Sequence, residues 1–362
     1  MSLSKRLESV QRLLSSKDMD FLLIDDPDSL FYLTNLQLSA GLMLITQKNA
    51  NLFVDGRYIA TARENSPFQV DLLSQEALSE TICTYGSNLS KKIGFNSSKT
   101  SYCSYLKFND FIERIKQQRK VVDFKLVAIE NPLKPFRLIK DATEIQKMKK
   151  AANLTWKAFE HICSFLTEGV KETEVAVEFE VFCRKNGADS MAFSPIIAFG
   201  ENTAYPHHKS SKRALKANDA VLIDIGIVLD HYCSDMTRMI FVGKPDPAIE
   251  KYYSVVKKAH QKALSLCKPG VKLGDLDRVA REVMAEEKIE ELFLHSLGHG
   301  IGIEVHEYPR IKWDGEDKDL ILKPGMVFTI EPGLYKEKIG GARYEDMILI
   351  TQDGYENFYS SI

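Results

Sequence analysis

Two aspartates stand in stretches that are otherwise typical of buried strands. Asp224 lies inside the apolar run Val221 to Gly226, where an ionised carboxylate is costly unless it is paired or bound to a metal. Asp235 follows eleven residues later and directly precedes a second apolar run, Met236 to Val242. Two neighbouring strands joined by a turn would bring these acids together, and close carboxylates repel each other unless a cation lies between them. The pair therefore indicates a cation site.

Three further residues have the same unusual character. His299 lies between two glycines, which permit close backbone approach, and histidine is the commonest transition-metal ligand. Glu331 directly follows the apolar strand pattern at 327–330, and Glu345 lies just before the one at 347–350. All three polar side chains are thus expected at strand ends or in glycine-rich segments.

Taken singly, each of these five residues has a structural explanation, because a buried acid can pair with Arg238 or Arg343. Together they favour a metal site. Four carboxylates and one imidazole form a hard, oxygen-rich set that suits Mn²⁺ first, then Fe²⁺, Co²⁺ or Zn²⁺, and excludes a structural zinc of the thiolate type. Four negative charges are enough for two divalent ions with bridging carboxylates.

Strands must position these residues, and two helices are predicted before them in the chain. A long helical pattern runs from Asp141 to Ile162, and a second one runs from Glu172 to Arg184. Short apolar runs bounded by turn residues then predict strands, interrupted by helices at 248–266 and 276–287. The predicted strands are 193–199, 220–229, 236–242, 326–330 and 347–350.

The N-terminal part predicts an α/β unit of its own, with an amphipathic helix at 3–14, a strand at 21–24 and a hairpin formed by 41–46 and 51–54. Further helices are predicted at 59–64, 76–85 and 105–118, followed by a strand at 121–124. A proline-containing stretch at 131–135 then interrupts the regular secondary structure. We therefore expect two domains, 1–130 and 131–362, with all the chemistry in the second.

Bulk composition excludes several classes of function. The 362 residues are 44% hydrophobic and 27% charged, as in an ordinary globular protein. A net charge of -2 provides no field to hold a nucleic acid backbone. The residues from Met1 to Glu8 mix charged and apolar types, so we expect no signal peptide, no membrane association and a cytoplasmic location. Six cysteines without a CxxC spacing are expected to be reduced.

Ordered motifs in the second half resemble those of the metallopeptidase family with the pita-bread fold, which includes aminopeptidase P, prolidase and methionine aminopeptidase. Segments 32–35 and 55–58 are similar to the extra domain of the proline-specific branch. The resemblance implies an α/β (α+β) protein, with a creatinase-like α/β domain followed by a pita-bread catalytic domain whose curved antiparallel sheet is flanked by helices. The matching motifs are 224–226, 234–238, 298–307, 329–333 and 343–346.

The same resemblance implies a role for each candidate residue. The metal ligands would be Asp224, Asp235, His299, Glu331 and Glu345, with Asp235 and Glu345 bridging two ions. Glu331 would also accept the proton of the bridging hydroxide.

Side chains around the ions would contact the substrate. His207 and His306 would hydrogen-bond it and stabilise the developing oxyanion, although His208 is an alternative to its neighbour. His295 would line the substrate pocket. Arg343 would either steer a substrate carboxylate or hold an acid in place.

The implied function is hydrolysis of the Xaa-Pro bond, in dipeptides or at the N-terminus of longer peptides, by a homodimer with two divalent ions per subunit. A methionine aminopeptidase is less favoured because that group generally lacks the N-terminal domain. Creatinase-like hydrolysis without metal, or a catalytically silent binding module on the same fold, is less favoured because all five ligand positions are filled.

Overall fold

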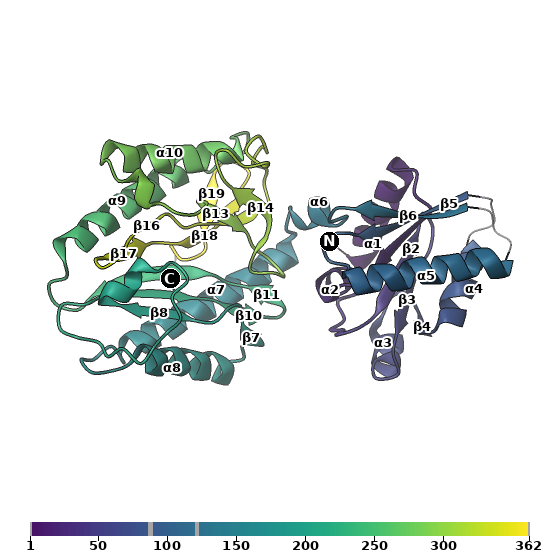
Figure 1. Ribbon diagram of the computed structural model, residues 1–362, viewed down its shortest axis with the longest axis horizontal. Helices are drawn as coiled ribbons and strands as arrows, with labels where there is room; N and C mark the ends of the chain where they lie inside the picture. Colours follow the sequence, from purple (N-terminus) through teal and green to yellow (C-terminus); the bar gives the residue numbers. More distant parts are fainter. Residues whose placement is uncertain (1, 86–89, 120–122, 361–362) are drawn as a thin grey trace. The chain divides into compact units, whose positions relative to one another are not determined.

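A computed structural model describes residues 2–85, 90–119 and 123–360 (Figure 1). The chain forms two compact units, Met1–Phe136 and Arg137–Ile362. Both combine helices with sheets, so the predicted α/β (α+β) class is confirmed. Within the described ranges, no helix is both long and apolar enough to span a bilayer.

The first unit is built on a mixed six-stranded sheet with the strand order β4-β3-β2-β1-β5-β6. The predicted hairpin is confirmed, because Leu42 pairs with Phe53 in antiparallel register. Residues 121 and 122 of the last predicted strand lie outside the described residues. The strands are β1 (Phe21–Ile24), β2 (Leu42–Thr46), β3 (Ala50–Val54), β4 (Gln69–Leu72), β5 (Ser90–Asn96) and β6 (Asp123–Ile129).

Helices cover this sheet because their apolar faces need burial. Ile82 and Ile112, from two of the helices, pack with Phe21 and Ile93 of the central strands in one hydrophobic core. Asp26 caps the second helix by accepting a hydrogen bond from the backbone N–H of Ser29. The helices are α1 (Leu3–Ser16), α2 (Pro27–Thr34), α3 (Ile59–Asn65), α4 (Gln75–Tyr85), α5 (Tyr102–Arg119) and α6 (Lys134–Arg137).

In the second unit, the long predicted helix begins at its expected cap. The Asp141 side chain accepts from the backbone N–H of Glu144, and the Glu144 carboxylate accepts in return from the backbone N–H of Asp141. The helices are α7 (Ala142–Cys163), α8 (Glu172–Lys185), α9 (Pro247–Leu264) and α10 (Leu273–Glu286), with short 3-10 turns η1 (Gly200–Ala204) and η2 (Glu290–Leu292).

The strands of this unit pair only in antiparallel fashion among the described residues, as expected for the catalytic domain. Three of the sheets have the orders β12-β9-β8, β11-β10-β7 and β14-β13-β15-β18-β19, and β16 pairs with β17. The strands are β7 (Ser190–Met191), β8 (Ile196–Phe199), β9 (Ala220–Ile225), β10 (Ile227–Leu229), β11 (Tyr232–Cys233), β12 (Met236–Phe241), β13 (Gly298–Gly300), β14 (Glu307–Ile311), β15 (Val327–Ile330), β16 (Gly333–Lys336), β17 (Gly340–Arg343), β18 (Asp346–Ile350) and β19 (Tyr355–Asn357).

Two details of the sheets bear on the site. The predicted strand at 220–229 is interrupted at Gly226, where an added Cβ would lie 2.3 Å from the carbonyl oxygen of Ser234, so only glycine fits. The hydrophobic core of this unit joins Leu222, Phe328 and Ile348 of the strands to apolar residues of α9 and α10, such as Val256. The strands that carry the candidate residues are thereby fixed to a packed layer of helices.

Candidate metal centre and substrate cavity

Strand register brings the candidate acids together. Asp224 on β9 lies opposite Thr237 on β12, and Thr237 also forms an isolated antiparallel bridge with Glu345. The Thr237 hydroxyl donates to Glu345 Oε2 at 2.8 Å. One threonine therefore joins the sheet that carries Asp224 to the segment that carries Glu345.

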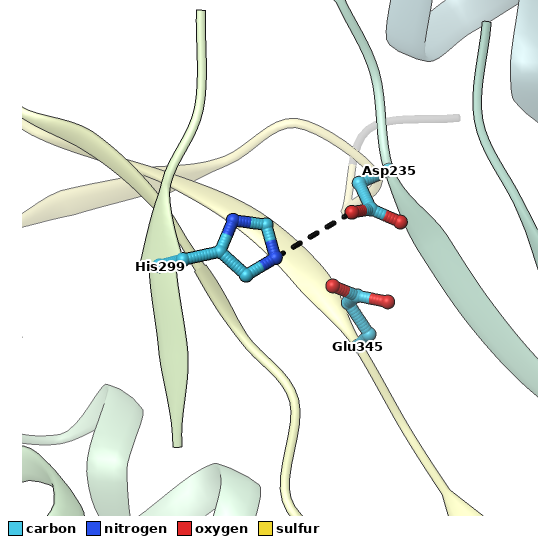
Figure 2. Close-up of side chains that lie close together, drawn as sticks. All are labelled: Asp235, His299 and Glu345. Atoms are coloured by element: carbon cyan, nitrogen blue, oxygen red, sulfur yellow. Dashed lines mark ion pairs between the residues drawn. The ribbon is translucent and has the colours of Figure 1, made fainter. Parts of the chain in front are cut away.

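Figure 2 shows the side chains of Asp235, His299 and Glu345 converging from separate segments of the chain. Each offers one ligand atom, and these atoms lie within 4.8 Å of one another. His299 Nε2 is 3.7 Å from Asp235 Oδ2 and 3.5 Å from Glu331 Oε1. Three of the five predicted ligands thus surround one point, and Glu331 lies beside the histidine among them.

The fifth predicted ligand, Asp224, is fixed from one side. Its Oδ2 accepts from Arg343 Nη2 at 2.5 Å, whereas its Oδ1 is buried with no hydrogen-bond partner within the described ranges. A buried carboxylate oxygen without a partner is costly unless an ion or a water molecule occupies its lone pairs.

The protonation of His299 follows from its contacts. Its Nδ1 lies 3.1 Å from the carbonyl oxygen of Gly300, which can only accept, so Nδ1 carries the proton. Burial and the neighbouring His306 lower the pKa of His299 to about 3, which keeps the ring neutral. The lone pair of Nε2 therefore faces carboxylate oxygens, an arrangement that a cation between them would satisfy.

Crowding of acids has a matching electrostatic effect. Burial and the nearby Glu345 raise the pKa of Asp235 and of Glu331 well above their ordinary values. Burial and Asp224 likewise raise the pKa of Glu345, to about 8. Each acid disfavours ionisation of the next, and a divalent cation among them would offset this repulsion.

These groups line a cavity of about 1000 Å³. Every residue that the sequence nominated reaches it, and the lining also includes apolar groups such as Phe193 and Ile196. A volume of this size accommodates a small peptide. The nominated residues in the lining are Asp224, Asp235, His299, Glu331, Glu345, His207, His306, His295 and Arg343.

Comparison with known protein families shows to which family the chain belongs. Residues 146–352 match the model of "Metallopeptidase family M24", and residues 6–139 match that of the "Creatinase/Prolidase N-terminal domain". The chain belongs to metallopeptidase family M24. It is accordingly a hydrolase of the metal-dependent type, and the predicted proline-specific branch is confirmed by its relatives.

Relatives of this M24 metallopeptidase match over nearly the whole chain. An Xaa-Pro dipeptidase of Pyrococcus horikoshii is 36% identical over 358 residues, which cover 97% of this chain and 96% of the relative. The structure of an Xaa-Pro dipeptidase from Bacillus anthracis has a TM-score of 0.90 and 32% identity, covering 100% and 98% of the two chains. That of an X-Pro aminopeptidase from Thermotoga maritima has a TM-score of 0.85 and 31% identity, covering 97% of each.

The donor set of this M24 metallopeptidase fits the divalent ions that the family implies. The neutral imidazole, the mutually repelling acids and Asp224, whose Oδ1 has no hydrogen-bond partner in the described part of the chain, all line the same cavity. Oxygen and imidazole donors of this kind suit Mn²⁺, Fe²⁺, Co²⁺ or Zn²⁺.

Arg343 is committed to holding neighbouring groups. Besides Asp224, its guanidinium donates to Thr237 Oγ1 at 3.1 Å, to the Tyr335 hydroxyl at 2.7 Å and to the Pro206 carbonyl at 3.3 Å. Of the two roles that the sequence left open, these contacts favour holding an acid in place.

The histidines differ in how they are held. His295 Nδ1 donates to the Ser296 carbonyl at 2.8 Å, and burial lowers the pKa of this ring to about 3, so its Nε2 accepts from the Tyr335 hydroxyl at 3.0 Å. The ring of His306 packs edge-on against His299, with centroids 4.2 Å apart. His207 and His208 both line the cavity, but His207 is exposed there, whereas the ring of His208 is bonded to a buried carboxylate.

Sequence reasoning missed three residues that support the site: Thr237, Tyr335 and Glu307. Thr237 lay inside a quoted motif, so its position beside Asp235 was the available signal. Glu307 lines the cavity beside His306 and is held by two buried cations. Tyr335 gave no signal, because its contacts come from tertiary packing alone.

Proposed function

We propose that this M24 metallopeptidase hydrolyses the Xaa-Pro bond, in dipeptides or at the N-terminus of peptides, with two divalent ions, preferentially Mn²⁺, at Asp224, Asp235, His299, Glu331 and Glu345. The observation that carries the proposal is the convergence of these five donors on one cavity. The proposed specificity for proline is supported by the relatives, which are named as an Xaa-Pro dipeptidase and an X-Pro aminopeptidase. Family membership alone would also admit other peptidases.

Divalent ions at these donors would polarise the scissile carbonyl and lower the pKa of an attacking water molecule. The protein's own groups divide the remaining work. Glu331 lies at the cavity wall and would accept the proton of the attacking water. His207 and His306 would donate hydrogen bonds to the substrate where negative charge develops on its carbonyl oxygen. Arg343 fixes the orientation of Asp224 throughout.

The cavity also offers cations for a substrate carboxylate. Lys209 and Arg310 line it, and neither side chain forms an ion pair with an acid of the described segments. In a dipeptide the terminal carboxylate lies next to the scissile bond, so a cationic wall favours such substrates. This supports dipeptides over longer peptides. We also propose a homodimer, as the resemblance to the family implies.

The test is hydrolysis of Xaa-Pro and Xaa-Pro-Yaa peptides with Mn²⁺, before and after chelation, with an Xaa-Ala dipeptide as the matched substrate control. We expect metal-dependent release from Xaa-Pro and much slower release from Xaa-Ala. Release from longer peptides at a comparable rate would identify an aminopeptidase instead. No release from any proline peptide would refute the proposal and favour a silent binding module.

The roles of the two cavity histidines are tested by His207→Ala and His306→Ala. Removing a group that stabilises the oxyanion typically lowers kcat about 100-fold or more. A variant that retains its metal and turns over at nearly the normal rate would remove that histidine from the mechanism.

A further inference from the structure

One buried carboxylate outside the metal centre organises the segment that carries His207. Glu172 is the first residue of α8, and its side chain is fully buried. Its Oε1 accepts from the backbone N–H of Phe199 and from Asn202 Nδ2, each at 2.8 Å. Its Oε2 accepts from His208 Nε2 and the backbone N–H of Ser211, each at 2.8 Å, and from Ser211 Oγ at 2.7 Å.

These hydrogen bonds all come from the segment 199–211. A carboxylate has about four lone-pair sites, so this single group is saturated by one stretch of chain. The stretch begins at Phe199, the end of β8, whose residue Ile196 lies opposite Asp224 of β9. Glu172 therefore connects α8, the strand beside a metal ligand, and the turn at the cavity wall.

His207 itself has no hydrogen bond to any described residue, although it lies at the cavity. Its backbone is held from both sides instead. On one side the Pro206 carbonyl accepts from Arg343, and on the other the ring of His208, 12% exposed, bonds to Glu172. The position of the His207 backbone is thus fixed by its neighbours in the chain.

We propose that Glu172 is a positioning residue, which acts through His208 to hold His207 in the orientation that contacts the substrate. The inference rests on the proposed function and also assigns the two adjacent histidines, with His207 facing the substrate and His208 serving as the tether. Glu172 does not itself touch the substrate.

The primary variant is Glu172→Gln. An amide replaces one acceptor oxygen by a donor, so either Phe199 or Ser211 loses the acceptor of its backbone N–H whichever way the amide turns. We expect kcat for an Xaa-Pro dipeptide to fall about tenfold, with KM changed less than twofold and Mn²⁺ content unchanged, because contacts made in the transition state affect kcat.

A matched control lies on the same helix. Glu178 Oε1 bonds to His161 Nε2 at 2.7 Å, a contact of the same kind whose residues do not line the cavity. Glu178→Gln should leave kcat unchanged. If Glu172→Gln does not fold, His208→Phe removes only one of the five contacts and should lower kcat by a similar factor.

The decisive comparison measures the effect of Glu172→Gln on kcat in the wild type and in the His207→Ala variant. If Glu172 acts only through His207, Glu172→Gln causes no further loss of kcat once His207 is absent. An equal loss of kcat in both backgrounds, or normal kcat in Glu172→Gln, overturns the proposal.

A measurement that does not depend on catalysis can test the positioning role of Glu172 separately from the proposed function. In ¹⁵N-histidine NMR spectra, Glu172→Gln should shift the ring signals of His208 and His207 but not those of His161. If these shifts occur while no Xaa-Pro peptide is cleaved, the proposed function fails and the positioning role stands. If the wild type cleaves Xaa-Pro and the His207 signals stay unchanged, the positioning role fails.

Discussion

Removal of the Arg137 charge is the most informative test of the buried charge network behind the cavity. Arg137 pairs with Glu307 through Nη2 and with Glu304 Oε2 through Nη1 at 2.9 Å, while Lys140 Nζ binds the other oxygen of Glu307 at 2.7 Å. The side chains of Arg137, Glu307 and Lys140 are only 7%, 7% and 2% exposed. Glu307 therefore depends on these two cations for its charge.

The expected magnitude follows from what Arg137→Met leaves behind. Removing one partner of a buried ion pair typically costs about 3–5 kcal/mol, because the other charge stays buried and uncompensated. Here Lys140 still binds Glu307, so we expect the lower limit, roughly 3 kcal/mol. For a unit of this size that corresponds to a Tm lower by about 6–12 °C. Thermal unfolding of the chelated protein, followed by circular dichroism, measures it.

The pH dependence has a definite sign. Burial alone would raise the pKa of Glu307, but Lys140 and Arg137 outweigh it and lower the pKa below the ordinary 4.5. A depressed carboxyl pKa gives stability that is fully present above the ordinary value and is lost as pH falls through the lowered one. The stability difference between wild type and Arg137→Met should therefore be largest near pH 7 and shrink below about pH 4.5.

Arg278→Met is the control, because Arg278 forms an exposed pair with Asp275 one turn away on α10, and such pairs contribute at most about 1 kcal/mol. The reasoning is refuted if Arg137→Met costs no more than this control, or if its cost is the same at pH 3.5 as at pH 7.

Two further predictions concern the centre of the site. Burial and mutual repulsion raise the pKa of Asp235, Glu331 and Glu345, so the chelated protein should lose stability as pH rises from about 4.5, by up to ~1.4 kcal/mol per pH unit for each proton released. Urea unfolding between pH 5.5 and 8 should show this slope only without Mn²⁺, and equal slopes in both forms would contradict it. Tyr335→Phe removes the 2.7 Å acceptor of Arg343 and should lower the free energy of unfolding by about 1.5–3 kcal/mol. A loss below ~0.5 kcal/mol in urea unfolding would show that the Tyr335 hydroxyl is dispensable.

The sequence was most informative where polarity conflicted with local pattern. Asp224 stood out because an acid inside an apolar strand needs a compensating charge, and the structure places it beside Arg343 and the other four candidates. In the turn before β11, His231 adopts the left-handed conformation with φ of 65°, which histidine tolerates better than most residues.

What the sequence could not predict depends on contacts between distant segments. Glu172 looks like an ordinary acid in the first turn of a helix, and its role is set by a loop that begins 27 residues later. Tyr335 meets Arg343 because the β16–β17 hairpin pairs Gly333 with Arg343, a register that local pattern does not fix. Arg343 could be recognised as important, but only its neighbours distinguish steering a substrate from orienting Asp224.

The sequence spacing of the five donors affects how the protein is made. Asp224 and Glu345 are separated by more than one hundred residues, yet the bridge between Thr237 and Glu345 joins their segments directly. With the proposed ligand set, a nascent chain on the ribosome cannot complete the site until Glu345 has emerged, and closure of so large a loop is slow. Binding of the divalent ions that the family implies would therefore require the β-sheets to have come together, and partial translation products should bind these ions weakly.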